Sequence, residues 1–326
     1  MAETKPGRPL HDVYVLFTMD CEPAKTEVTP YGTRMSKSGP SNWAESASAI
    51  RHYVAAVRVH GFPVTLFIHP EVAANQRDLL RELQRDGACL GLHLHPYKLA
   101  GGRHRYDLGA YPYAEQRAIL EEAAHLWERA LRQEPRWFRG GYFSANDATF
   151  ALLSELGFRG GSVSIPGRVL PSHGSVWAGA EPYPHRAHLA FRQLLGESDF
   201  VEIPVSVDWK RPVEVGEAGE QGYEWPYIPA EKYDHPQVIR GILEGVRREA
   251  PRYGTLVMDT HNDKDYADPH HPATVNLRRI LDAIASAAPP LGLRPVGVTV
   301  EQLCDRLLLE EGKAPSRLGS RKEKRQ

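Results

Sequence analysis

Cysteine is scarce in this chain of 326 residues. Only Cys21, Cys89 and Cys304 occur, an odd number spread over most of the length, which makes a disulfide framework unfavourable. Cys21 and Cys89 lie within or beside apolar runs, so we expect them to be packing residues. The scarcity argues against a small secreted domain held together by disulfides.

Long apolar runs are also missing. No stretch approaches the roughly 20 apolar residues that a membrane helix needs. The first residues, MAETKPGRPLHD, lack the apolar core of a secretory signal. We therefore expect a cytoplasmic protein with no membrane partner.

Neither sign of charge is in excess, because the chain has 40 Lys and Arg residues and 41 Asp and Glu residues. A nucleic-acid partner is therefore not expected, since such a surface needs a basic excess. The sequence also lacks a Walker phosphate loop, a G-x-G-x-x-G turn and a G-x-S-x-G elbow. Nothing favours a nucleotide-binding protein or a serine hydrolase.

Short apolar runs alternate with amphipathic segments along the chain. Residues 13–19 (VYVLFTM) are nearly continuously apolar, as in a strand that is buried on both faces. This alternation predicts an α/β fold, a single distorted (β/α) barrel of about seven or eight parallel strands. The predicted strands are 13–19, 63–68, 88–92, 136–139, 158–164, 200–207, 255–260 and 293–298, and the predicted helices are 43–60, 77–86, 113–133, 147–156, 236–249, 272–287 and 299–309.

The prediction places one barrel domain over residues 12–310. Residues 1–11 form a polar leader, and residues 311–326 form a basic tail that we expect to be disordered. Within the domain, the connections 165–198 and 209–234 are long for plain loops. They are predicted to be binding loops or lids.

Polar side chains gather where the predicted strands end, which is where a parallel barrel carries its functional groups. Asp20 and Glu22 end the first strand, and His93 and His95 end the third. Alternate residues of a strand point the same way, so each pair can share one face. Two imidazoles and one carboxylate suit a divalent metal ion, most simply Zn²⁺, with Co²⁺, Ni²⁺ or Mn²⁺ as alternatives. The second carboxylate is then left to act as a base.

Three further strands end in polar groups: Arg139, the pair Asp208 and Trp209, and His261. Each feature has a plainer interpretation by itself. A pair of histidines can be structural, a D-x-E can cap the next element, and an arginine can form a salt bridge. Their recurrence at five strand ends of one regular alternation favours a functional site.

The order of these residues resembles the polysaccharide deacetylases of the NodB-homology type. The resemblance runs from about Val13 to Leu309. The stretches that resemble the five family motifs are 18–22 (TMDCE), 91–96 (GLHLHP), 138–142 (FRGGY, for R-x-P-Y), 207–209 (VDW) and 256–261 (LVMDTH).

This resemblance implies a metal-dependent hydrolase. The expected reaction removes an acyl group, expected to be acetyl, from the amide nitrogen of an amino sugar or a related small molecule. The implied roles are Asp20 as catalytic base, Glu22, His93 and His95 as metal ligands, Arg139 as the residue that orients the base, Asp208 as its support, the backbone N–H near Tyr142 as an oxyanion donor, Trp209 as a wall of the acetyl pocket and His261 as general acid.

The chain departs from the family pattern at three points. A D-x-E at 20–22 stands where the family has adjacent aspartates. The histidines are two residues apart rather than four, so that Tyr97 stands four residues beyond His93. Gly141 replaces the proline of R-x-P-Y. These changes indicate a divergent branch of the family.

The departures leave two ligand assignments open. Glu22 has the longer reach and is assigned to the metal, but the reverse assignment, with Asp20 as the ligand, remains an alternative. His95 is assigned as the second imidazole ligand, although another residue could occupy that position.

Two other functions fit the same residues. The substrate could be a non-sugar amide, as in ring-opening amidohydrolases. Alternatively, the domain could be a non-catalytic glycan binder that stacks sugars on loop aromatics. The loop aromatics that would stack on sugars are Trp177, Tyr183, Tyr223, Trp225 and Tyr227.

The sequence makes no prediction of the oligomeric state.

Overall fold

A computed structural model describes residues 10–25, 38–215 and 219–311. The leader predicted over residues 1–11 lies outside the described residues except for its last two. The tail predicted over residues 311–326 lies outside them except for its first residue. The proposed domain boundaries therefore remain a prediction.

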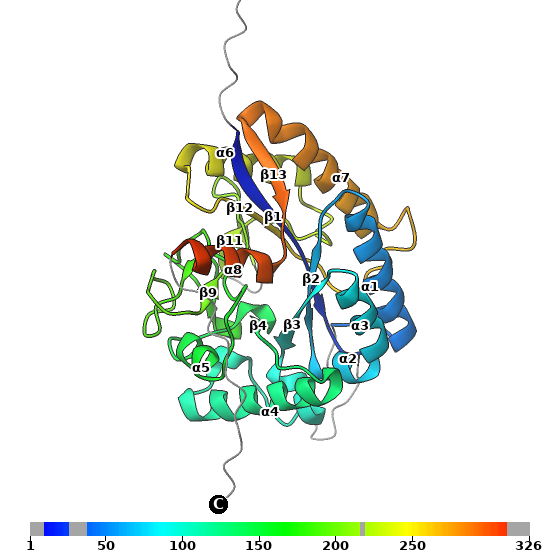
Figure 1. The fold of residues 1–326 in the computed structure, drawn as a ribbon, viewed down its shortest axis with the longest axis vertical. Coiled ribbons are helices and arrows are strands. Elements are labelled where there is room, and N and C mark those ends of the chain that lie inside the picture. Colours follow the sequence, from blue (N-terminus) through cyan, green and yellow to red (C-terminus); the bar gives the residue numbers. More distant parts are fainter. Residues whose placement is uncertain (1–9, 26–37, 216–218, 312–326) are drawn as a thin grey trace, which may run out of the picture.

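One large curled sheet organises the molecule (Figure 1). Its strands follow the order β12-β1-β2-β3-β4-β5-β9-β8, and β13 also pairs with β1. Within it every pairing is parallel except that of β8 with β9. The predicted α/β fold with a barrel-like, mainly parallel sheet is confirmed. The strands are β1 (His11–Cys21), β2 (Val64–Ile68), β3 (Cys89–Leu94), β4 (Trp137–Gly140), β5 (Gly160–Gly161), β8 (His185–Arg186), β9 (Val201–Glu202), β12 (Thr255–Met258) and β13 (Leu293–Gly297).

A side chain links the segment that follows β9 to β12, the strand at the opposite end of the curled sheet. The Ser206 hydroxyl, which follows β9, accepts a hydrogen bond from the Val257 N–H at 3.0 Å. The same hydroxyl donates to the Thr255 carbonyl at 3.2 Å. Both partners belong to β12, so a serine bridges strands that a regular barrel joins by backbone hydrogen bonds. The barrel is therefore distorted, as the sequence predicts.

The central strand β1 contributes to two apolar cores. Val15 and Phe17 belong to one buried cluster, and Tyr14 and Leu16 belong to the other. Side chains of a strand alternate between its faces, which explains why the run at 13–19 is apolar at every position except Thr18. Asp20 continues the series of Tyr14 and Leu16, so it points to the same side as the second cluster.

Helices follow the strands and cover the outside of the sheet (Figure 1). No helix in the described part of the chain is long and apolar enough to cross a membrane. All three cysteines are free and buried. The helices are α1 (Trp43–Arg58), α2 (Pro70–Asn75), α3 (Arg77–Arg85), α4 (Tyr113–Leu131), α5 (Thr149–Glu155), α6 (His235–Glu249), α7 (Pro272–Ala287) and α8 (Val300–Glu310).

The two long connections form a second sheet, which the sequence does not predict. Their short strands pair in the antiparallel order β10-β11-β6-β7. Strands of two or three residues carry too few alternations to be detected in a sequence. The strands are β6 (Val169–Leu170), β7 (Ser175–Val176), β10 (Pro212–Glu214) and β11 (Gln221–Tyr223).

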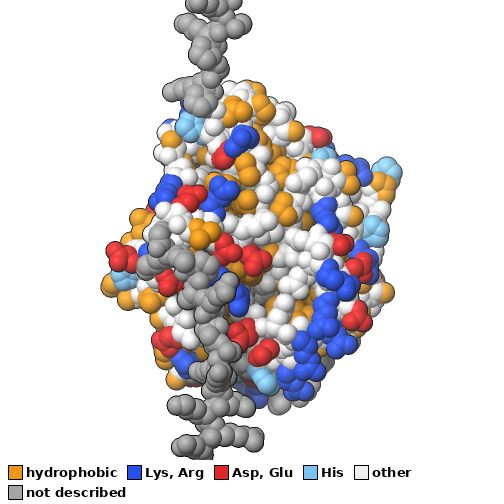
Figure 2. Space-filling view, viewed as in Figure 1, with side chains coloured by type: hydrophobic (Ala, Val, Ile, Leu, Met, Phe, Trp, Pro, Cys, Tyr) orange, Lys and Arg blue, Asp and Glu red, His pale blue; other side chains and the backbone are white. Residues whose placement is uncertain are grey.

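Acidic and basic side chains are interleaved on the face shown in Figure 2. Between α1 and α3, for example, Arg51 pairs with Glu82 at 2.8 Å and Arg58 with Asp86 at 3.5 Å. Such exposed pairs each contribute about 0–1 kcal/mol to stability. These two pairs therefore contribute little to the stability of the fold.

Candidate metal centre and active site

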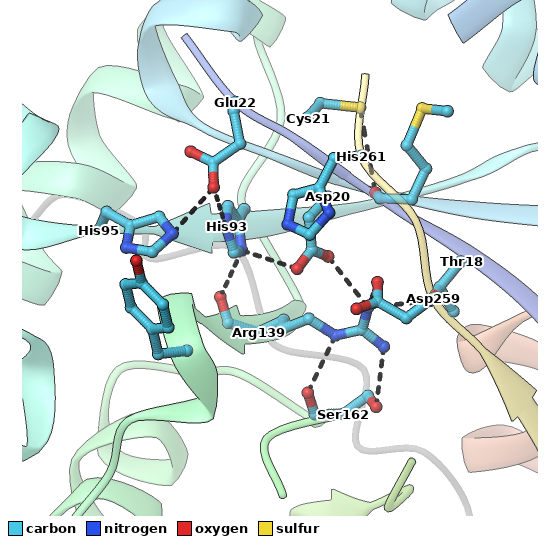
Figure 3. A network of polar contacts seen from close by, with 12 residues as sticks. Thr18, Asp20, Cys21, Glu22, His93, His95, Arg139, Ser162, Asp259 and His261 are labelled. Carbon is cyan, nitrogen blue, oxygen red and sulfur yellow. Dashed lines mark hydrogen bonds and ion pairs between the residues drawn. The ribbon is translucent and has the colours of Figure 1, made fainter. Parts of the chain in front are cut away.

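The polar strand ends meet on one side of the sheet (Figure 3). Parallel strands present their carboxyl ends to the same edge, so residues far apart in sequence come together there. Asp20 and His261 even form an isolated parallel bridge between the ends of their segments. The groups that converge are Asp20, Glu22, His93, His95, Arg139, Asp259 and His261.

Glu22, His93 and His95, which we call the metal corner, point at one another. The Glu22 Oε1 atom lies 2.8 Å from His95 Nε2 and 3.4 Å from His93 Nε2. None of the three residues is more than 4% exposed. Tetrahedral zinc with bonds of about 2.1 Å separates its ligand atoms by roughly 3.4 Å. The three side chains therefore fit such an ion with little movement.

Both histidine rings are oriented by contacts at their Nδ1 atoms, on the side away from Glu22. His93 Nδ1 lies 3.1 Å from the Arg139 carbonyl oxygen, and a carbonyl can only accept, so this nitrogen carries the hydrogen. His95 Nδ1 faces the buried carboxylate of Asp107 at 3.6 Å. The Nε2 atom of each ring therefore faces Glu22, and after losing its hydrogen it can ligate a metal ion.

Glu22 is held at both its backbone and its carboxylate. The Asn262 side chain accepts from the Glu22 N–H at 2.8 Å and donates to its carbonyl at 3.0 Å. Lys98 donates to Oε2 at 2.7 Å. Burial alone would raise the pKa of Glu22, but the charges of His95 and Lys98 and hydrogen bonds from both histidines hold it well below its usual value. The carboxylate is therefore ionised and can serve as a ligand.

Asp20, Arg139 and Asp259 form a second group, the arginine corner. Arg139 Nη1 donates to Asp20 Oδ1 at 2.9 Å and to Asp259 Oδ1 at 3.0 Å. Its Nη2 donates to the Ser162 hydroxyl at 2.9 Å, and its Nε donates to the Ser162 carbonyl at 3.2 Å. The guanidinium is fully buried beside the Phe67 ring. These contacts fix Asp20 in one orientation.

Asp208 is not the residue that supports Arg139, contrary to the expectation from the family motif. Its carboxylate lies 3.6 Å from Arg211 Nε and packs so close to Gly241 of α6 that a Cβ there would clash. The acid that pairs with the arginine is Asp259. Burial and the nearby Asp20 charge raise the pKa of Asp259, and Arg139 opposes that rise.

Trp209 lies at the second sheet. Its ring meets that of Tyr223 edge to face with centroids 4.8 Å apart, and the residue is 40% exposed. The aromatic ring that reaches the catalytic side is Tyr227, whose hydroxyl is 3.2 Å from His261 Nδ1. The role of Trp209 in an acetyl pocket remains a prediction.

His261 lies beside Asp20, and Tyr142 lies beside His95. Burial lowers the pKa of His261, although Asp20 and Glu22 oppose the change. The Tyr142 ring meets His95 edge to face at 5.3 Å. Tyr142 and Phe143 both have left-handed backbones, with φ of 54° and 57°. Such strain costs about 1–3 kcal/mol per residue and is typical of functional sites.

Two of the departures from the family pattern are coupled in space. A Cβ atom at Gly141 would lie 2.1 Å from the His95 ring. A proline at this position, as in R-x-P-Y, would therefore occupy the space that His95 takes. The Tyr97 ring packs 5.1 Å from the His95 ring instead of entering the metal corner. The histidine spacing and the glycine thus belong to one rearrangement.

Several residues of the site were not singled out by the sequence analysis. Asp259 could have been found, because it stands two residues before His261 and so points to the same side of its strand. Lys98, Asp107, Ser162 and Asn262 follow no such pattern. They lie in helical turns and loops, and only the fold brings them to the site.

Sequence comparison assigns part of the chain to a family. Residues 39–161 match the family model for polysaccharide deacetylase. A search of curated proteins finds no match. The sequence evidence for the family therefore rests on this segment, which includes His93, His95 and Arg139.

Solved structures extend the likeness to the whole fold. A structure from Mycobacterium smegmatis assigned as a polysaccharide deacetylase is 16% identical, with a TM-score of 0.55, over 98% of this chain and 100% of that chain. Another, from Pseudomonas aeruginosa PAO1, is 12% identical over 91% of each chain, with a TM-score of 0.56. The Puue allantoinase is 10% identical over 91% of this chain and 90% of its own, with a TM-score of 0.54. The predicted resemblance is confirmed: residues 39–161 match the polysaccharide deacetylase family model, and the described chain has the fold of the two deacetylase structures.

Proposed function

We propose that this protein is a metal-dependent hydrolase that removes an acyl group, acetyl in the simplest case, from the amide nitrogen of an amino sugar or a related small molecule. One observation carries the proposal. A buried Glu-His-His cluster with ligand atoms within 4.8 Å of one another lies beside an aspartate that an arginine holds in place.

The chemistry needs a base, an ion and an acid. A divalent ion at Glu22, His93 and His95 would polarise the acyl oxygen and lower the pKa of water. Asp20, oriented by Arg139, takes the proton of the attacking water. His261, oriented by the Tyr227 hydroxyl, gives a proton to the departing nitrogen. The backbone N–H near Tyr142 stabilises the oxyanion.

The geometry supports Glu22 as the ligand and Asp20 as the base. The Glu22 carboxylate is the one that lies within 3.4 Å of both Nε2 atoms. Asp20 instead approaches His93 on its Nδ1 side, at 3.8 Å. Because that nitrogen carries a hydrogen, Asp20 lies on the side of the ring that faces away from the metal corner.

Two substrate classes fit this site. We favour a small or nucleotide-linked N-acyl amino sugar over a wall polymer, because the long connections 165–198 and 209–234 suit binding loops that enclose a small ligand. A second candidate is a non-sugar amide, because the fold matches an allantoinase as well as it matches the two deacetylase structures.

An activity screen tests the proposal. Metal-free protein is titrated with Zn²⁺ and assayed for acetate released from N-acetylglucosamine, from chitin oligomers and from non-sugar amides including allantoin. We expect one bound ion per chain and zinc-dependent turnover of a small N-acetylated sugar. Turnover of non-sugar amides alone supports the second candidate. Protein that binds no divalent ion and cleaves no amide is a non-catalytic relative, and the proposal is then wrong.

A further inference from the structure

Arg168 directly precedes β6 of the second sheet and packs against two aromatic rings. The residue is 6% exposed. Its guanidinium lies 4.8 Å from the Trp225 ring centroid and 5.4 Å from that of Phe143. Its Nη1 donates a long hydrogen bond of 3.4 Å to the Tyr142 carbonyl. Burial lowers the pKa of Arg168 to about 10, so the side chain remains charged at neutral pH.

Arg168 differs from the other arginines that stack on aromatic rings. Within the described residues, each of those has a carboxylate within 4.0 Å, and Arg168 has none. The acid that acts most strongly on it is Asp259, which is paired with Arg139. The compared pairs are Arg139 with Asp20, Arg159 with Asp305, Arg192 with Asp147, Arg252 with Glu310 and Arg306 with Glu310.

A buried guanidinium without a counterion is unfavourable, because desolvation is not offset by an ion pair. Its planar fork matches the geometry of a carboxylate or a phosphate. The indole Nε1 of Trp225 is also buried and has no hydrogen-bond partner among the described residues. A cation without a counterion beside a donor without a partner favours an anionic ligand that accepts hydrogen bonds.

This position adjoins the candidate reaction centre on two sides. Tyr142, which accepts the hydrogen bond from Arg168, contacts the His95 ring. Trp225 stacks on Tyr227 with centroids 5.5 Å apart, and Tyr227 reaches His261. An anion held by Arg168 would therefore lie near the amide that is cleaved.

We propose that Arg168 binds an anionic group, a carboxylate or a phosphate, carried by the substrate. That the anionic group belongs to a substrate rests on the proposed amide hydrolysis, whereas the anion site itself does not. The competing explanation is structural: the arginine only ties the second sheet to the barrel through its aromatic contacts.

The first test measures anion binding without metal. Wild type, Arg168→Met and Arg192→Met are kept in chelator and titrated with inorganic phosphate and with acetate by calorimetry. Arg192 is the matched control, because it also stacks on a tryptophan, Trp177, but already has Asp147 as a partner. We expect Arg168→Met to bind at least about tenfold more weakly, and Arg192→Met to bind like wild type.

The second test identifies the anion. Zinc-loaded protein is assayed on N-acetylglucosamine, its 6-phosphate and N-acetylmuramic acid, which carry no anion, a phosphate and a carboxylate. Arg168→Met should raise KM for the preferred anionic substrate roughly 10- to 100-fold with little change in kcat. It should leave the neutral sugar unaffected. Arg168→Lys, which keeps the charge but not the fork, should lie between.

The outcomes separate this inference from the proposed function. Equal kcat/KM for neutral and anionic amides, with anion affinity unchanged in Arg168→Met, overturns the role of Arg168 and leaves the hydrolase intact. Anion affinity lost in Arg168→Met without turnover of any amide supports the anion site and contradicts the hydrolase. Reduced stability to urea in Arg168→Met with unchanged anion affinity identifies a structural arginine.

Discussion

The metal corner and the arginine corner lie side by side, yet they are built differently. In the arginine corner, all three nitrogens of Arg139 donate to protein acceptors. In the metal corner, His93 and His95 are held from behind, and their Nε2 atoms converge on Glu22. The first corner is complete in the protein alone, whereas the second has the form of a site that an ion completes.

This difference separates what stabilises the fold from what performs the chemistry. A buried ion pair contributes little by itself, but removing one partner leaves a costly unpaired charge. Substitutions in the arginine corner should therefore mainly lower the free energy of unfolding. The metal corner should be sensitive in metal affinity and turnover.

The largest effect is expected from Arg139→Met. It leaves Asp20 and Asp259 buried without their cation, which should lower the free energy of unfolding by about 3–5 kcal/mol. The control, His95→Ala in metal-free protein, should lose about 1 kcal/mol, as an average point mutant does. Urea unfolding of both variants in chelator measures the difference, and equal losses would remove the distinction between the corners.

The next largest effect distinguishes the role of Asp20 as base from that of Glu22 as metal ligand. Asp20→Asn should lower turnover by about 10²–10⁴-fold, the range for a lost general base, while still binding one zinc ion. Glu22→Gln should lose zinc affinity first, because it removes a ligand. Zinc titration and turnover at saturating metal decide the matter. A metal-free Asp20→Asn beside a normal Glu22→Gln would reverse the two roles.

Gly141→Ala tests whether the metal corner depends on its neighbour. The added methyl group would lie within 2.1 Å of the His95 ring and should push that ligand aside. We expect zinc affinity to fall about 10- to 100-fold, as for other changes that misplace a ligand. Gly245→Ala in α6, where a Cβ would meet only the end of the Arg248 side chain at 3.8 Å and φ is not positive, is the matched control for stability. Unchanged affinity in Gly141→Ala would mean that His95 is not a ligand.

Asp259→Asn tests the corrected partner of Arg139. Because Asp259 helps to hold the arginine that orients Asp20, turnover should fall by roughly tenfold, within the range seen when a supporting residue is altered. Asp208→Asn should remain near wild type, since Asp208 pairs with Arg211. Initial rates at saturating zinc compare the two. The opposite ranking would restore the assignment from the family motif.

The smallest effect concerns His185, a buried histidine that belongs to neither corner. Burial lowers the pKa of His185, and its Nδ1 faces the Tyr183 carbonyl at 2.8 Å. The unfolded chain therefore binds the proton more readily, so stability is full above about pH 6.5 and falls as the pH drops toward the folded-state pKa. One such group changes the free energy of unfolding by at most about 1.4 kcal/mol per pH unit. Urea unfolding at pH 7.5 and 5.5 should show a smaller acid loss in His185→Asn than in wild type.

The regular part of the fold could be predicted because its signals are local. A buried strand such as β1 must be apolar on both faces, and each covering helix carries an apolar stripe. The second sheet could not be predicted, because its strands are two or three residues long. Such strands are defined by their partners rather than by their own sequence.

The site divides in the same way. The sequence by itself determined which strand ends carry chemistry, because alternation along a strand places Asp20 with Glu22 and His93 with His95. Only the tertiary structure decided that Asp259 rather than Asp208 pairs with Arg139, and that Gly141 leaves room for His95. These choices depend on the relative positions of separate strands and loops. The His95 ring and a side chain at position 141 are 46 residues apart in the sequence. They compete for the same space only after folding has brought the two positions into contact.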